Sequence, residues 1–173
     1  HKTFQMNALL IKDEALRIEA LNHYEVLNST PDPVLDDITR LAAQVCSAPV
    51  AAISLIGADR IWIKSRTGMD AQELSLGSLP CETTILGDTV HELSDARNDP
   101  DYAPDGIVVE GRSYRFYAGA PLTTPGGVSI GALLVLDQRS RMLSPDESLA
   151  LSTLAHQVIT RLELNSRIRQ MDR

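Results

Sequence analysis

The chain has 173 residues, 43% of them hydrophobic and 23% charged, which is typical of one globular domain with a short extension. No apolar run approaches the roughly 20 residues that a membrane-spanning helix needs, so we predict no membrane association. The net charge is −7, and the 16 basic residues form no cluster, which argues against a nucleic-acid partner.

The first 27 residues predict a helix from about residue 7 to the end of that stretch, because they are rich in Leu, Ala, Glu and Arg and hold no Gly or Pro there. Its apolar residues fall on more than one face: Ile11, Ala15 and Ile18, and around them Leu9, Leu16, Ala20 and Tyr24. A helix lying on a domain needs only one apolar stripe. We therefore expect one face to pack on the domain and another on a partner.

A proline-containing break at residues 28–33 precedes a second predicted helix over residues 34–46. Residues 50–56 are an apolar run typical of a strand. Residues 61–67 alternate in the way that predicts the second strand of an antiparallel hairpin. Residues 68–80 have weak periodicity, and we expect a loop.

A short helix is predicted over residues 81–86 and a short strand over residues 89–93. Residues 94–111 read as a long loop, and such loops inside compact domains are often functional. Carboxylates in this region greatly outnumber Arg97, its single basic residue up to position 110: Glu92, Asp95, Asp99, Asp101, Asp105 and Glu110. A solvated loop is the main interpretation. Cation binding is the alternative, although the regular spacing of a calcium loop is missing.

Residues 115–122 and 128–136 predict a second hairpin. Gly119 and Gly131 lie inside these two strands, where glycine often marks a bulge or the close approach of another backbone.

The last helix has a clear start. Ser144 is a good N-cap, Pro145 suits the first helical position, and Glu147 completes a capping box. The helix can run to near Met171, and it carries two apolar stripes. The first holds Leu151, Leu154, Val158 and Leu162; the second, rotated from it, holds Leu164, Ile168 and Met171. One stripe can cover a sheet, whereas the later one needs another partner.

Strands that come mainly as hairpins favour an antiparallel sheet with helices packed against it, an α+β architecture. Several segments add to this order: Arg17-Ile-Glu-Ala-Leu, Tyr24-Glu-Val-Leu, Asp36-Asp-Ile-Thr-Arg-Leu-Ala, Ile53-Ser-Leu-Ile, Asp59-Arg-Ile-Trp-Ile-Lys-Ser, Asp95-Ala-Arg-Asn-Asp-Pro, Arg115-Phe-Tyr-Ala-Gly-Ala-Pro-Leu, Pro125-Gly-Gly and Ile130-Gly-Ala-Leu-Leu-Val-Leu-Asp. In this order and spacing, over about residues 15–164, the chain resembles the GAF family of bacterial signalling proteins.

The resemblance implies a central antiparallel sheet of about five to six strands with helices on both faces, as in GAF and PAS domains. The first and last helices would cover one face and pair with a second subunit. Short helices and loops on the other face would close over a small-molecule pocket. We divide the chain into a helical extension over residues 1–14, a GAF domain over 15–164 and a signalling-helix extension over 165–173.

The function that this resemblance implies is regulatory. Such domains usually sit upstream of a histidine kinase, a diguanylate cyclase or another output domain, and no motif of those outputs occurs in this chain. We expect a sensor without catalytic residues of its own, with an unidentified small molecule as ligand and a homodimer through the terminal helices. The alternatives are a bilin-binding photosensor, an enzyme similar to free methionine-R-sulfoxide reductase, and a ligand-free dimerisation module.

The chain has two cysteines, Cys46 and Cys81, and no CxxC pair. They make neither a disulfide framework nor, without histidines at ligand spacing, a zinc site. We therefore expect a reducing, cytoplasmic setting, no metal, and no cofactor that the sequence requires.

Cys81 begins the short helix that should border the pocket, and a thiol at a helix N-terminus can have a lowered pKa. In the bilin-binding branch of the family, a cysteine near this position attaches the chromophore and is commonly followed by histidine; here Glu82 follows. The reductase branch uses several cysteines around the pocket, and this chain offers one there, since Cys46 falls at the end of a helix. A buried structural thiol is the main interpretation.

Besides Cys81 and its neighbour Glu82, four further residues are candidates for ligand contact. Trp62 is either core or a ligand platform, and His91 should lie near the pocket edge. Arg115 and Tyr117 share one strand face and could hold a polar or anionic ligand there. The alternative for this pair is an Arg in solvent and a Tyr in the core.

Overall fold

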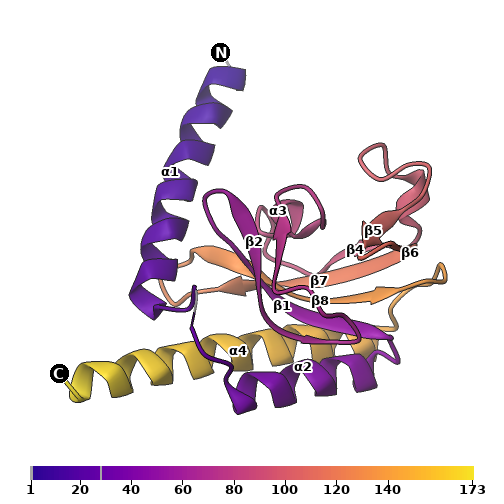
Figure 1. Ribbon diagram of the computed structural model, residues 1–173. Coiled ribbons are helices and arrows are strands. Elements are labelled where there is room, and N and C mark those ends of the chain that lie inside the picture. Colours follow the sequence, from indigo (N-terminus) through magenta and orange to yellow (C-terminus); the bar gives the residue numbers. More distant parts are fainter. Residues whose placement is uncertain (1, 28) are drawn as a thin grey trace.

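The computed structural model in Figure 1 describes residues 2–27 and 29–173, with side chains from residue 13 onward. Leu9 and Ile11, on which part of the first-helix prediction rests, therefore lie outside the described side chains. In chain order the elements are α1 (Lys2–Tyr24), α2 (Pro33–Val45), β1 (Val50–Ile56), β2 (Arg60–Thr67), β3 (Glu73–Ser75), α3 (Cys81–Thr84), β4 (His91–Leu93), the 3-10 helix η1 (Ala96–Asn98), β5 (Ile107–Val109), β6 (Arg112–Tyr114), β7 (Phe116–Thr123), β8 (Ser129–Asp137) and α4 (Pro145–Met171).

A six-stranded sheet forms the centre of the domain, in the order β3-β2-β1-β8-β7-β4, and all its neighbours are antiparallel. Both predicted hairpins are present, as β1–β2 and β7–β8, and β1 joins them by pairing with β8. Strands β5 and β6 make a separate two-stranded sheet. The predicted α+β architecture with long terminal helices is confirmed.

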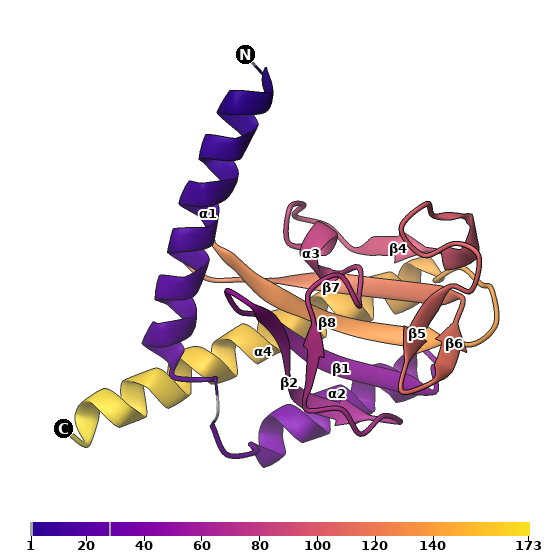
Figure 2. The same ribbon diagram turned by 45° about the horizontal axis from the view of Figure 1, so that its top comes forward.

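Side chains alternate between the two faces of the sheet, and each face has its own core. On one face Ile53 and Leu133 pack beneath α2 and α4, which lie side by side in Figure 1. On the other face Ala52 and Leu134 pack beneath α3 and the segments that follow it. Figure 2 shows α3 and the β5–β6 pair on the side of the sheet away from α2. Helical cover on both faces agrees with the sequence prediction.

The first helix differs from its expected role. It was expected to share one sheet face with the last helix, but α2 takes that position and α1 projects away from the body (Figures 1 and 2). Of its described side chains, those from Asp13 to Leu16 are exposed, whereas Leu21 and Tyr24 are buried. The helix thus docks only by its last turns, where the Tyr24 hydroxyl donates to Glu163 Oε1 on α4 at 2.5 Å.

Two predicted loops contain short regular elements. Residues 68–80 hold β3, which pairs three residues with β2 at the sheet edge, and residues 94–111 hold η1 and β5. Three-residue elements carry too few alternations to show a period in the sequence. The first helix ends at Tyr24 rather than at residue 27, because Glu25 takes a left-handed conformation with φ of 53° that stops it.

Helix α4 begins as predicted. The Ser144 side chain accepts from the Glu147 backbone N–H at 3.1 Å, and the Glu147 carboxylate accepts from the Ser144 N–H at 2.8 Å. Helix α2 has an N-cap that the sequence analysis did not single out, Asp32, which accepts from Val34 N at 3.0 Å and also binds Arg161 of α4 at 2.9 Å. Within the described residues, no helix is long and apolar enough to cross a membrane.

Both strand glycines mark close approaches, of a backbone at Gly131 as predicted and of a side chain at Gly119. A Cβ on Gly131 would lie 1.8 Å from the Ser54 carbonyl oxygen of the neighbouring strand β1. A Cβ on Gly119 would lie 2.2 Å from the Tyr117 hydroxyl, so the absence of a side chain at 119 gives the tyrosine ring its place. Both glycines therefore set how tightly the centre of the sheet packs.

We expect Gly131→Ala to lower the free energy of unfolding by about 1–3 kcal/mol, because the added methyl group must push strands β1 and β8 apart. Urea denaturation of the purified domain measures this. The matched control is Gly87→Ala, where the nearest atom to the new Cβ is 3.9 Å away. Equal stability of the two variants would contradict the close approach at Gly131.

Candidate functional site

The sheet face beneath α3, where the family pocket was expected, is filled by side chains of the domain itself. The residues of this cluster are almost inaccessible to solvent: Val50, Ala52, Ile56, Ile61, Ile63, Leu79, Cys81, Ala96, Ile107, Val109, Tyr114, Tyr117, Ala132, Leu134 and Leu136. Two of the predicted site residues, Cys81 and Tyr117, are members of it. They therefore contribute to packing in this conformation.

Cys81 is fully buried at the start of α3. Burial raises the pKa of its thiol to about 12, although a hydrogen bond with Ser54 acts in the opposite direction. This agrees with the main interpretation of Cys81 as a buried structural thiol and not with a lowered pKa. Helix α3 has only four residues, and the loss of water outweighs the stabilisation that so short a helix gives a thiolate.

Cys46 lies on the other side of the sheet, buried beneath α4, where burial raises its pKa to about 11. The two thiols are both free and belong to different cores. Because the sheet separates them, they cannot form a disulfide without unfolding of one layer.

A polar chain connects this core to the sheet edge. The Tyr117 hydroxyl lies 2.7 Å from Thr84 Oγ1, which lies 2.9 Å from Nδ1 of His91 and donates to the Pro80 carbonyl at 3.2 Å. The imidazole also stands edge-on to the Tyr117 ring, with 5.6 Å between the ring centres. His91 and Tyr117 are thus the two predicted residues that the fold brings into direct contact.

His91 is half-buried on the edge strand β4. Burial lowers the pKa of its imidazole, and the nearby Asp99 carboxylate only partly offsets this. The neutral ring accordingly accepts or donates one hydrogen bond at Nδ1 according to its tautomer.

The other three predicted residues lie elsewhere. Glu82 accepts from the Gly77 backbone N–H and so closes the turn before α3. Arg115 is exposed, while Tyr117 is core, so the second of the two interpretations of that pair holds. Trp62 packs against the helix-side core, with the Arg60 guanidinium 4.2 Å from its ring centre.

The carboxylates of the acidic loop hold the loop in place. Asp95 binds Arg97 at 2.6 Å and accepts from the Ser140 hydroxyl at 2.9 Å. Glu92 accepts from the backbone of Leu143 at 2.7 Å, and Glu110 from the backbone of residues 70 and 71. Among the residues that the structure describes, no three His, Cys, Asp or Glu side chains gather as a metal site. These contacts favour the structural interpretation of the loop over cation binding.

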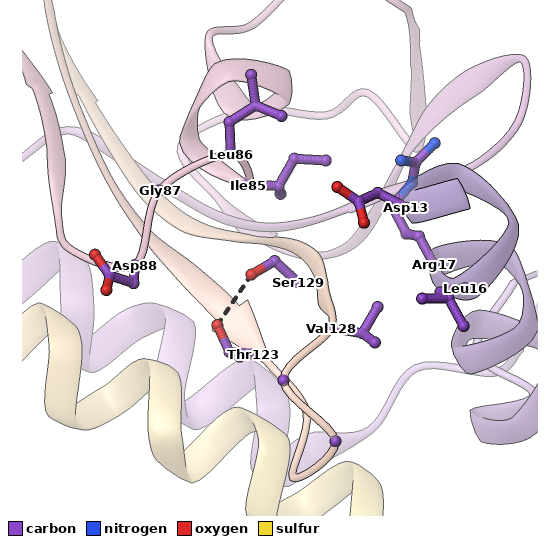
Figure 3. A pocket seen from close by; sticks show the side chains of 12 residues that line it. Asp13, Leu16, Arg17, Ile85, Leu86, Gly87, Asp88, Thr123, Val128 and Ser129 are labelled. Carbon is purple, nitrogen blue, oxygen red and sulfur yellow. Dashed lines mark hydrogen bonds between the residues drawn. The ribbon is translucent and has the colours of Figure 1, made fainter. Parts of the chain in front are cut away.

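One cavity lies away from all six predicted residues. A cleft of about 600 Å³ separates α1 from the domain body (Figure 3). It is lined by Asp13, Leu16 and Arg17 of α1, residues 85–88 after α3, and the β7–β8 turn from Thr123 to Ser129. No pattern in the sequence points to this cleft, because its short segments lie far apart in the chain and share no motif.

Comparison with known proteins agrees with the fold. The family model described as the GAF domain matches residues 30–162. A cyclic di-GMP phosphodiesterase of Pseudomonas aeruginosa is 32% identical over 130 residues, which are 75% of this chain. The chain spans only 22% of that relative's length.

Solved structures give the same architecture at low identity. The GAF domain of an Acinetobacter phosphoenolpyruvate-protein phosphotransferase superposes with a TM-score of 0.65 at 16% identity, covering 90% of this chain and 93% of its own. Free methionine-R-sulfoxide reductase of Neisseria meningitidis superposes with a TM-score of 0.63 at 19% identity and the same coverage. At this identity the likeness concerns the fold.

We expect acid to destabilise the domain partly through His91. Its pKa is lowered in the folded state, so the unfolded chain binds the proton more readily, and stability falls as the pH drops through about 6.5. Between about pH 7.5 and 5 the wild type should lose more unfolding free energy than His91→Gln, which keeps a polar group beside Thr84. Parallel pH profiles in urea denaturation would rule out this contribution.

We expect Cys81 to be inert in the folded protein. In a Cys46→Ala variant, the remaining thiol should react with an aromatic disulfide reagent at pH 8 more than about a hundredfold more slowly than in urea, because burial removes both access and thiolate. The double variant Cys46→Ala/Cys81→Ser has no thiol and gives the background signal of the reagent. Rapid modification without denaturant would contradict the buried position.

Proposed function

The chain belongs to the GAF domain family, and on this basis we propose that it is the regulatory, small-molecule-sensing domain of a signal-transduction protein. It would transmit its state through dimerising terminal helices to an output domain outside this chain. The phosphodiesterase relative supports an output that acts on cyclic di-GMP, and a two-component histidine kinase is the other candidate. Two free cysteines fit a reducing, cytoplasmic setting.

The observation that carries the proposal is an apolar stripe at the end of α4. Leu164, Ile168 and Met171 are 47%, 45% and 83% exposed and are spaced by four and three residues, as in a coiled-coil seam. In Figure 1 this end of α4 runs beyond the sheet. A second copy of the chain would bury these side chains in a homodimer.

The terminal helices are also joined to each other. Besides the bond from Tyr24 to Glu163, Arg169 of α4 donates to the Tyr24 carbonyl at 2.6 Å and forms an ion pair with Glu25 at 2.7 Å. Any ligand that favours one position of α1 would therefore favour one arrangement of α4. Such a difference in affinity between two arrangements is what a sensor requires.

Several observations weigh against the enzyme and photosensor alternatives. A reductase of this fold needs cysteines that meet, and here the sheet lies between Cys46 and Cys81. Bilin attachment needs an accessible thiol, and Cys81 is fully buried. The ligand-free dimerisation module is the second candidate, favoured by the filled core beneath α3. A metabolite panel without any thermal shift would favour it over the sensor.

We expect light scattering to find a homodimer, and Ile168→Glu to shift it to monomer by placing two charges in the seam. The control is Leu149→Glu, the same change on an exposed residue near the other end of α4. Leu149→Glu should keep the wild-type melting temperature, whereas Ile168→Glu should lose only the stabilisation that dimerisation provides. A wild-type monomer at high concentration, or loss of the dimer only in Leu149→Glu, would refute dimerisation through this stripe.

A further inference from the structure

We propose that the cleft between α1 and the domain body is a binding site for a small organic cation with an apolar body, such as an aliphatic amine. The site is separate from the filled face beneath α3, and none of the six predicted site residues lines it. The binding itself follows from the cleft; its consequence for signalling rests on the proposed function.

The size and walls of the cleft suit a small ligand. Its volume of about 600 Å³ lies within the range of about 300–1,000 Å³ that small-molecule sites occupy. Three separate elements form it: α1, the segment after α3 and the β7–β8 turn. In Figure 3 the α1 side chains stand on one side, with Leu86 and Asp88 across from them.

Apolar side chains provide its walls. Leu16 on α1 and Leu86 opposite are 39% and 65% exposed, although both are large and hydrophobic. Ile85 and Val128 add partly buried surface between them. A single exposed leucine is ordinary, but several that converge on one concave surface mark a place for an apolar ligand.

The charges of the lining favour a cation. Asp13 on α1 and Asp88 on the body carry carboxylates on opposite sides of the cleft (Figure 3). Within the described part of the chain, no basic side chain forms an ion pair with either of them. The lining has one basic residue, Arg17, whose Nε donates to the Ile56 carbonyl at 2.9 Å and so holds the guanidinium to the wall. One arginine against two aspartates leaves the lining with a net negative charge.

Polar groups at the base of the cleft complete the site. The Thr123 and Ser129 hydroxyls lie 3.0 Å apart, so one donates to the other, and lone pairs remain on both oxygens to accept from an ammonium group. A ligand that contacts both Asp13 and Asp88 would join α1 to the body. The described hydrogen bonds from α1 to the rest of the domain begin at Arg17, so a ligand held by Asp13 would add a contact beyond them. Occupancy of this cleft would thereby favour one position of the helix that the proposed function requires to move.

Isothermal titration of the whole chain with hexylamine tests the site, with hexanoate and hexanol as probes that share the apolar body but lack the positive charge. We expect saturable binding of hexylamine that is stronger than binding of either other probe. Asp13→Asn and Asp88→Asn should each weaken it about two- to fivefold, the range of exposed ion pairs. Leu86→Ser should weaken all apolar probes.

The matched control is Glu14→Gln, which removes a charge next to Asp13 from an exposed position on α1 outside the lining. It should bind hexylamine as the wild type does. Absence of saturable binding, equal binding of hexanoate, or unchanged binding by both aspartate variants would overturn the site.

A second measurement separates the site from the sensor. Spin labels on Glu14→Cys of α1 and Asp59→Cys of the β1–β2 turn report the distance between helix and body. A change of that distance with hexylamine supports both proposals. Binding that depends on Asp13 and Asp88 without any change of distance leaves the site standing and overturns its role in signalling.

Discussion

The central strands β1 and β8 are buried on both faces, and this requirement organises the rest of the molecule. Every residue of β1 and nearly every residue of β8 is inaccessible to water. Backbone groups pair within the sheet, but the side chains need apolar cover above and below it. Helices α2 and α4 supply one cover, and α3 with the following loops supplies the other.

The cover beneath α3 has a direct consequence for function. Side chains such as Tyr117 and Leu134 occupy the space in which related domains are expected to hold a ligand. The Tyr117 ring lies over Gly119, and its hydroxyl forms a hydrogen bond with Thr84, which in turn contacts His91. The hydroxyl therefore has a hydrogen-bond partner without a ligand. The space left for a small molecule is at the periphery, where α1 leaves the body.

Helix α4 connects the sheet and α2 with the end of α1. Its first half covers the sheet. Further along, Arg161 and Asn165 bind Asp32, the cap of α2, and burial of that carboxyl is outweighed by these bonds, which lower its pKa to about 2. Its last turns hold the end of α1 through Glu163 and Arg169. Helix α4 thus contacts the sheet, α2 and α1, while its outer stripe is exposed.

The sequence by itself determined the order and type of the main elements, because their signals are local. A continuous apolar run predicted β1, alternation predicted β2, and the capping box predicted the start of α4. Gly131 indicated the close approach of a neighbouring backbone before that partner was known. The three-residue strands β3 and β5 were missed, because so short a segment shows no period. Of the candidate site residues, only some lie together as the strand pattern predicted. Tyr117 and His91 meet, whereas Trp62 faces the other core and Arg115 faces solvent.

Only the tertiary structure decided which of these residues are accessible and which merely pack. The state of Cys81 depends on how completely neighbouring chain segments exclude water, and this is a property of the packed core rather than of the residues next to it. The same holds for the cleft beside α1, whose walls come from positions near 15, 86 and 126. Distances between such segments are set by the fold, so no local pattern in the chain could have revealed the site.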